Sequence, residues 1–162
     1  MIILGIDPGL NISGYGVIRY KRRTPEFISA GTIKTSAACD FPEKLEILYR
    51  NCCDIIGDFK PDVIAIEETF TNVNPRSSLK LGHARGVLML AGRMADKKVY
   101  EYPATIVKKS LTGTGGATKK QVRYMVMKIL HLSDLPAPYD ISDALAIALT
   151  HYHHLRFQIL SS

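Results

Sequence analysis

The sequence predicts an α/β fold, a mixed five-stranded sheet flanked by helices, and three observations indicate it. First, residues 14–20 and 27–34 are apolar strands joined by a short basic turn, which is typical of an antiparallel meander with the strand at residues 2–6. Second, apolar residues recur at helical spacing over residues 42–60. Third, residues 61–68 are almost continuously apolar, as expected for a central strand covered on both faces. Three strands, a helix and a further strand in this order predict a mixed sheet with helices on its faces.

The second half of the chain continues the alternation of helices and strands. We expect a helix at residues 77–98, a short strand at 99–103, a helical turn at 105–111, a helix from 118 to about 132, and a final helix at 141–155. Thr118 and Gln121 form a capping-box pattern, which marks the start of the fourth of these elements. Gly82, Gly86 and Gly92 each destabilise a helix by roughly 1 kcal/mol relative to alanine, so they predict that another element approaches the helix at 77–98 closely.

Length and composition predict one domain over residues 1–156, followed by a frayed tail at 157–162. No apolar run approaches the roughly 18 residues of a membrane span, and the first residues lack the basic and small-residue pattern of a secretory leader. Cys39, Cys52 and Cys53 form no CxxC pair, which favours a reducing compartment. We therefore expect a cytoplasmic protein with no membrane partner. The net charge of +6 is a weak indication of a polyanionic partner.

Four carboxylates stand at the ends of predicted elements. Asp7 ends the strand at 2–6, and Glu67 ends the strand at 61–68. If these strands are parallel neighbours, the two carboxylates lie side by side where ligands gather in open α/β sheets. Asp140 and Asp143 are three residues apart at the start of an otherwise apolar helix, so they share one of its faces.

The four acids together predict a site for hard divalent cations. Several carboxylates within a few ångströms cannot all ionise without a cation, and all-oxygen ligands select Mg²⁺, or Mn²⁺ in its place. Two ions about 3.5–4 Å apart can activate water and stabilise the leaving oxygen of an in-line phosphoryl displacement. On this hypothesis Asp7 is a ligand on rigid backbone, and the glycines after it leave room for a substrate.

Each acid has a simpler interpretation as well. Asp7 can serve only its own turn through an Asx hydrogen bond. Glu67, beside Glu68, can be an ordinary solvated strand end. Asp140 can be only the N-cap of the last helix. Asp143 is harder to explain in this way, because apolar residues surround it in the sequence.

Basic residues flank the glycine-rich stretch at 112–118. Lys108 and Lys109 precede it, and Lys119 and Lys120 open the following helix, where free N–H groups also favour phosphate. A solvated basic face is an equally good interpretation of these lysines. A second polar and basic stretch follows Glu67 and contains Phe70, Arg76 and Lys80. An exposed Phe70 can stack on an unpaired base, but it can equally be a core residue.

Two further motifs predict no function. The stretch GTGGATKK lacks the glycine that a P-loop requires before its lysine, and no apolar strand leads into it. His151 and His154 share a helix face, but the sequence shows no further soft ligand beside them.

The motifs ILGIDPG, GYGVI, AIEETF, SLKLGHARG and DISDALAIALTH, in this order and spacing, resemble the RuvC family of bacterial Holliday-junction resolvases over about residues 2–154. The resemblance implies a ribonuclease-H-like fold and a homodimer that makes paired symmetric nicks in four-way DNA junctions, with Mg²⁺ or Mn²⁺, in recombination and repair. The bacterial branch-migration motor is its expected partner. The helix at 77–96 falls in the region that the family uses near its dimer interface.

Matched position by position, the resemblance also implies roles for single residues. The metal-binding acids are Asp7, Glu67, Asp140 and Asp143, although some members have histidine at the position of Asp140. Lys108 and Lys119 match basic positions that handle phosphate, and we expect Lys119 to take part in catalysis. Phe70 matches an aromatic residue that stacks on bases near the crossover. Arg76, Lys80, Lys109 and Lys120 complete the set of expected DNA contacts.

Two other classes of function are weighed against an endonuclease. A non-catalytic junction-binding protein would not need all four acids. An actin-like or sugar-kinase phosphotransferase can also carry an IDPG turn after a strand, but such enzymes need two lobes and a longer chain than 162 residues.

Overall fold

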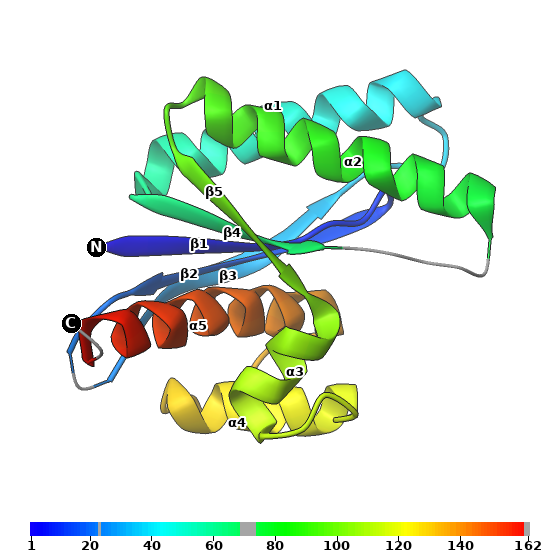
Figure 1. Ribbon diagram of the computed structural model, residues 1–162. Coiled ribbons are helices and arrows are strands. Elements are labelled where there is room, and N and C mark those ends of the chain that lie inside the picture. The colour runs from blue at the N-terminus through cyan, green and yellow to red at the C-terminus, as the bar shows by residue number, and fades with distance from the viewer. Residues whose placement is uncertain (23, 69–73, 161–162) are drawn as a thin grey trace.

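A computed structural model describes residues 1–22, 24–68 and 74–160, with side chains up to residue 158 (Figure 1). Its elements are β1 (Ile2–Asp7), β2 (Ile12–Arg19), β3 (Glu26–Lys34), α1 (Phe41–Phe59), β4 (Val63–Glu68), α2 (Pro75–Met94), β5 (Lys98–Pro103), α3 (Ala104–Thr112), α4 (Lys119–Ile129) and α5 (Tyr139–Leu160). Among these described residues, no helix is long and apolar enough to cross a membrane.

The five strands form one mixed sheet in the order β3-β2-β1-β4-β5. β1, β2 and β3 are antiparallel neighbours, whereas β4 pairs in parallel with β1 and β5 with β4. The predicted meander and the predicted parallel pair are therefore both confirmed. In the parallel pair Ile6 lies opposite Ile66, so the residues that follow them, Asp7 and Glu67, emerge together at one edge of the sheet.

Helices cover both faces of the sheet (Figure 1). α1 and α2 pack on one face around a core that includes Leu4, Leu48 and Leu88. α5 packs on the other face, and α3 and α4 lie outside α5 around a core that includes Leu145 and Leu149. Residues 141–152 of α5 are buried except for the half-buried Asp143, so this part of the helix is apolar around most of its circumference.

Glycines in β1 and β2 allow α5 to lie directly on the strands. A Cβ atom at Gly5 would lie 2.2 Å from the carbonyl oxygen of Ala144, and one at Gly14 would lie 1.9 Å from that of Asp140. Both distances are far below van der Waals contact, so any larger residue would push the helix off the sheet. The glycines thus determine how close the first turns of α5 come to the end of β1.

Three helices end three or more residues from their predicted ends. The helix predicted at 77–98 is α2, which ends at Met94. The capping box of Thr118 and Gln121 is present, but α4 ends at Ile129, about three residues before the predicted end. α5 begins at Tyr139 and continues to Leu160, past the predicted boundary at 156. The division of the chain into one domain and a tail stays a prediction, because residues 161 and 162 lie outside the described ones.

Candidate active site

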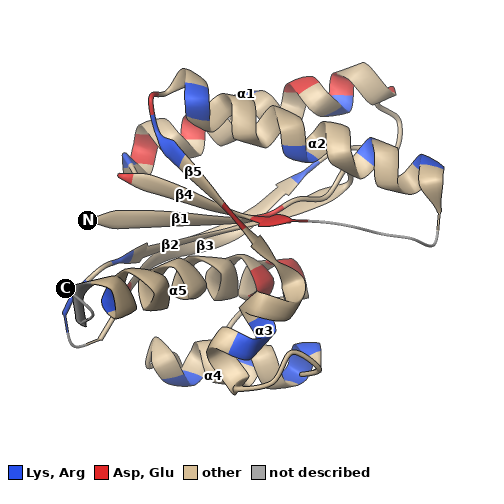
Figure 2. Cartoon of the chain, viewed as in Figure 1, with Lys and Arg blue, Asp and Glu red and all other residues tan. Residues whose placement is uncertain are grey.

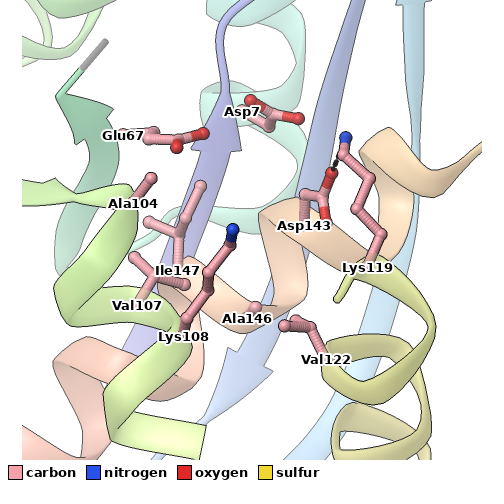
Figure 3. A pocket seen from close by; sticks show the side chains of 10 residues that line it. All are labelled: Asp7, Glu67, Ala104, Val107, Lys108, Lys119, Val122, Asp143, Ala146 and Ile147. Carbon is pink, nitrogen blue, oxygen red and sulfur yellow. Dashed lines mark hydrogen bonds and ion pairs between the residues drawn. The ribbon is translucent and has the colours of Figure 1, made fainter. Parts of the chain in front are cut away.

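Three of the four predicted acids surround one pocket at the carboxyl edge of the central strands. Asp7 comes from β1, Glu67 from β4 and Asp143 from α5, and Figure 3 shows the three side chains around a common space. The pocket has a volume of about 210 Å³, and Lys108 of α3 and Lys119 of α4 also line it. Its remaining walls are small or apolar side chains: Ala104, Val107, Val122, Ala146 and Ile147.

The carboxyl groups of Asp7 and Glu67 form the inner part of the site. The two side chains line the same pocket and interact electrostatically. Burial raises the pKa of Asp7 well above its usual range, and the charges of Glu67 and Asp143 raise it further. Burial also raises the pKa of Glu67, although the interaction with Asp7 and the charge of Lys119 oppose this change. A cation placed between the two groups would relieve this mutual repulsion.

Asp143 is held by an ion pair on the outer side of the pocket. The Nζ atom of Lys119 donates a hydrogen bond to its Oδ2 atom at 2.7 Å. Burial raises the pKa of Asp143 in spite of this partner. For Lys119, burial alone would lower the pKa, but the bond to Asp143 and the surrounding acids outweigh it and raise the pKa. Lys119 therefore carries its charge at neutral pH and fixes the position of one carboxylate.

Lys108 and Asp140 act on the site in different ways. The side chain of Lys108 reaches into the pocket from α3 (Figure 3), and its charge lowers the pKa values of Glu67 and Asp143. Asp140 is half-buried in the first turn of α5, next to the pocket rather than in its wall. Its charge raises the pKa values of Asp7 and Asp143. Since α5 begins at Tyr139, Asp140 lies inside the helix and is not its N-cap.

The turn after Asp7 does not have the role that the sequence predicted for it. Its glycines do not leave room for a substrate: Gly14 accommodates the backbone of α5, and a Cβ atom at Gly9 would lie 1.9 Å from the carbonyl oxygen of Ile12. The turn is closed by Ser13, whose Oγ atom accepts a hydrogen bond from the Gly9 N–H at 3.0 Å and donates to the Gly9 carbonyl at 2.7 Å. Ser13 therefore supplies the side-chain bonds that an Asx turn would take from Asp7.

The donor set of the pocket fits a hard divalent cation. Every carboxylate there offers oxygen only, and oxygen donors suit Mg²⁺ or Mn²⁺ better than Zn²⁺. Over residues 1–22, 24–68 and 74–160, however, no three acidic, histidine or cysteine side chains converge closely enough to ligate one ion as they stand. Binding would therefore require the carboxylates to turn toward the ion.

The other predicted DNA contacts among the described residues do not line the pocket. Figure 2 shows acidic residues at the ends of the central strands and at the start of α5, with basic residues on α2, α3 and α4. Lys109 and Lys120 are exposed on α3 and α4. Arg76 and Lys80 are exposed at the start of α2. The remaining predicted contact, Phe70, lies outside the described residues.

Sequence reasoning missed the residues that bring α5 to the strands, above all Gly5 and Gly14. A signal was present, because isolated glycines inside a strand pattern mark close approach of another backbone. The alanines at 144 and 148 are the matching small residues on α5, and the Cβ atom of Ala148 would lie 2.9 Å from a Cβ atom at Gly5.

Comparison with known proteins assigns the chain first to a fold class and then to a family. A mixed five-stranded sheet with carboxylates at the edge between its parallel strands and a covering helix is a ribonuclease-H-like fold. A model of the family "Crossover junction endodeoxyribonuclease RuvC" matches residues 3–151. The chain therefore belongs to the RuvC family.

Individual relatives agree with this assignment. The RuvC of Actinobacillus succinogenes is 49% identical over 158 residues, which cover 98% of this chain and 82% of that protein. The structure of Thermus thermophilus RuvC has a TM-score of 0.89 at 33% identity and covers 98% of this chain and 97% of its own. A second T. thermophilus RuvC structure, described as a complex with Holliday junction substrate, has a TM-score of 0.88 at 31% identity and covers 97% and 96%.

Proposed function

We propose that this protein is a metal-dependent endonuclease that resolves Holliday junctions by paired, symmetric nicks during recombination and repair. The observation that carries the proposal is the pocket at the carboxyl edge of the sheet, where Asp7, Glu67 and Asp143 come together between Lys108 and Lys119. Membership of the RuvC family supports the choice of substrate, because the family is described as crossover junction endodeoxyribonucleases.

The four acids would hold the metal. Asp7, Glu67 and Asp143 line the pocket, and Asp140 adds negative charge beside it. The metal would be Mg²⁺, with Mn²⁺ as a substitute and two ions in each site, and it would supply a Lewis acid that activates water and stabilises the leaving oxygen. Its positive charge would offset the repulsion among the buried carboxylates.

The two lysines would orient the acid and the phosphate. Lys119 keeps Asp143 in one position through its 2.7 Å hydrogen bond, which makes it a positioning residue for the metal and a catalytic residue where its charge also reaches the substrate. Lys108 faces the open pocket, so its ammonium group can contact a non-bridging oxygen of the phosphate that is cut. Lys109, Lys120, Arg76 and Lys80 would bind the backbone further from the cut, and Phe70 would stack on bases at the crossover.

We further propose a homodimer that uses the exposed face of α2. Leu79, Leu90 and Met94 are 66%, 53% and 68% exposed on this helix. A side chain at Gly82 or Gly86 would meet no other atom within 4 Å, so these glycines approach no other element of the described chain. A second copy that packs here would cover the apolar residues and explain the two glycines. Symmetric nicking requires two such sites, one in each subunit.

The remaining proposals concern the cellular compartment of the protein and its protein partner. The low cysteine content and the absence of disulfide pairs among the three described cysteines support a cytoplasmic enzyme. The proposed cellular partner is the bacterial branch-migration motor, which would deliver four-way junctions to the dimer.

The test is to incubate the purified protein and Mg²⁺ with a mobile four-way junction, and separately with linear duplex and single strands of the same sequence. We expect paired, ligatable nicks in the junction alone. Equal cutting of all three substrates would retain metal-dependent hydrolysis but contradict junction specificity. Junction binding without cutting under any divalent ion would favour the non-catalytic alternative, and nucleotide binding would favour a phosphotransferase.

A further inference from the structure

A second hollow, of about 490 Å³, lies at the same edge of the sheet as the acidic pocket but on the side of β3. Three segments that are distant in the sequence form it: the turn between β1 and β2, the end of β3 with the loop after it, and the first turns of α1. The residues that line it are Asn11, Ile12, Lys34, Thr35, Ala37 and Lys44. Neither the predicted DNA contacts nor the acidic site include any of them.

Hydrogen bonds hold these segments in place. Lys44 donates from Nζ to the Oδ1 atom of Asn11 at 2.7 Å, which joins α1 to the β1–β2 turn. The Thr35 N–H donates to the Asn11 carbonyl at 3.0 Å, and its hydroxyl donates to the Leu10 carbonyl at 2.8 Å, which joins the end of β3 to the same turn. The hollow is thus formed before any ligand arrives, and a ligand would not have to order these segments.

The hollow carries uncompensated positive charge. Over the described residues, neither Lys34 nor Lys44 has a carboxylate within the 4.0 Å of an ion pair. The acids nearest in the sequence have other partners: Asp40 and Glu43 are engaged with the backbone in the capping box of α1, and Glu46 pairs with Arg50. Lys44 uses one of its three N–H donors on Asn11 and keeps two for a ligand. Such a site suits an anion with several oxygens, such as a phosphodiester.

The position of the hollow relates it to the acidic pocket. Asp7 lies opposite Gly14 of β2, which lies opposite Thr32 of β3, and Lys34 is two residues further toward the edge. Two strand spacings of about 4.8 Å and two residues of about 3.3 Å place the backbone of Lys34 roughly 12 Å from that of Asp7. A DNA strand carries one phosphate per roughly 3.4 Å of axis, and its winding places neighbouring phosphates farther apart than this rise, so the distance corresponds to about two phosphates.

We propose that this hollow, through Lys34 and Lys44, binds the phosphodiester backbone of the strand being cut, about two nucleotides from the cut on one side. The inference rests on the proposed function, because it takes DNA as the substrate. It adds a second point of attachment for the same strand, at β3, beyond the lysines of α3 and α4. A strand held at two points lies across Asp7 in one register, so the hollow fixes which phosphate reaches the acids.

The test measures junction binding as a function of salt with the Lys34→Gln/Lys44→Gln double variant. Both it and its parent carry Glu67→Gln, so that no strand is cut during the titration. Loss of one phosphate contact lowers the slope of log affinity against log salt by about 0.9, equivalent to roughly 8-fold weaker binding at 0.1 M salt than the parent. Lys60→Gln/Lys98→Gln removes two exposed charges at the opposite edge of the sheet and is the matched control.

Charge-neutral methylphosphonates in the cut strand then locate the contact. We expect a substitution about two nucleotides from the cut to weaken binding by the parent roughly 8-fold and to have no further effect on the double variant. Lys34→Gln alone leaves the Lys44–Asn11 bond intact and, with an unchanged melting temperature, separates loss of a contact from loss of structure.

The outcomes separate this inference from the proposed function. An unchanged salt slope, an equal loss in the control, or methylphosphonate effects that persist in the double variant would overturn the inference. Failure of the wild-type protein to cut a junction would instead overturn the proposed function, and the salt slope alone would then decide whether the hollow binds backbone phosphate.

Discussion

The two ends of α5 both bury polar side chains, but they do so in opposite ways. At its start, Asp143 faces Asp7 and Glu67; burial raises the pKa values of all three carboxyl groups, and the charge of Asp143 raises those of Asp7 and Glu67 further. Near its other end, His151 is 1% exposed, and its Nδ1 atom is hydrogen bonded to the Tyr102 hydroxyl at 2.7 Å. The ring of Tyr100 packs on the same imidazole at 4.5 Å between centroids.

This difference separates buried polar side chains that stabilise the folded protein from those that need a ligand to offset their charge. Burial lowers the pKa of His151 to about 4, so the ring is neutral at physiological pH and its hydrogen bond is satisfied by the chain itself. Among the residues that the structure describes, the acids at the other end have one cationic partner in direct contact, Lys119. Buried charges without sufficient partners destabilise a fold, so their presence indicates a function that the fold does not need.

We expect the largest effect from removing a carboxylate charge at the acidic end of α5. Glu67→Gln should lower the rate of junction nicking at least about 10³-fold, equivalent to roughly 4 kcal/mol, and leave junction binding within about twofold, because a neutral amide cannot replace a metal-binding carboxylate. Single-turnover nicking and a binding titration measure the two effects. Glu68→Gln changes the neighbouring carboxylate of the same strand end and is the control. Wild-type turnover in Glu67→Gln would exclude the proposed role of the pocket.

We expect the next largest effect from removing the buried imidazole of His151. His151→Ala should lower the free energy of unfolding by about 2–4 kcal/mol, because it opens a cavity and leaves the Tyr102 hydroxyl without its acceptor. Nicking measured well below the melting temperature should remain near wild type. Chemical denaturation measures the loss, and His154→Ala, at an exposed position three residues on, is the control with an expected change below about 1 kcal/mol. Equal losses in both variants would contradict the comparison.

The same histidine predicts a pH dependence. Its pKa is about 4 in the folded chain and about 6.5 when unfolded, so the unfolded state binds more protons between these values. Stability contributed by the neutral ring is therefore present above pH 6.5 and is lost as the pH falls toward 4, by up to about 3 kcal/mol. His151→Gln can accept the Tyr102 bond but cannot titrate. Its stability should thus fall less than that of the wild type from pH 7 to 4.5, and parallel curves would contradict the assignment.

The smallest expected effect is a gain in stability when one carboxylate of the acidic cluster is neutralised. In a buffer with a chelator, Asp7→Asn should raise the free energy of unfolding by about 1–2 kcal/mol, because it removes one buried charge from a repulsive cluster. A melting temperature higher by a few degrees would show this. Adding 10 mM Mg²⁺ should then raise the melting temperature of the wild type but not of the variant. Destabilisation by Asp7→Asn in the chelator would mean that the carboxylate has a structural role.

Local sequence patterns were sufficient to predict much of the fold and of the site. The strand at the start of the chain, the parallel strand that ends at Glu67 and the helix that begins near Asp140 follow from hydrophobic period and turn chemistry, which act over a few residues. Placing Asp7 beside Glu67 needed one further rule, that neighbouring parallel strands end at the same edge of the sheet. The family resemblance agreed with these positions, and the family model now covers residues 3–151.

Contacts between distant segments could not be predicted from such local patterns. The sequence showed glycines near Asp7 but not that Gly14 lies under the carbonyl of Asp140, because that contact depends on the path of a helix more than a hundred residues later. Likewise, the glycines of α2 predicted a close neighbour. Gly92 has one in Ile64, whereas Gly82 and Gly86 face open space. The same limit applies to the histidines near the end of α5, one of which is a buried structural residue paired with Tyr102.

The sequence by itself thus determined the type and order of the elements, and the carboxylates at their ends. These properties are set by neighbours along the chain, since backbone preference and hydrophobic period are local. Only the tertiary structure decided that Lys119 pairs with Asp143, and that Lys34 and Lys44 share a hollow with Asn11. Those contacts arise when whole helices settle against the sheet, and the depth at which they settle depends on side-chain volumes at positions far apart in the chain.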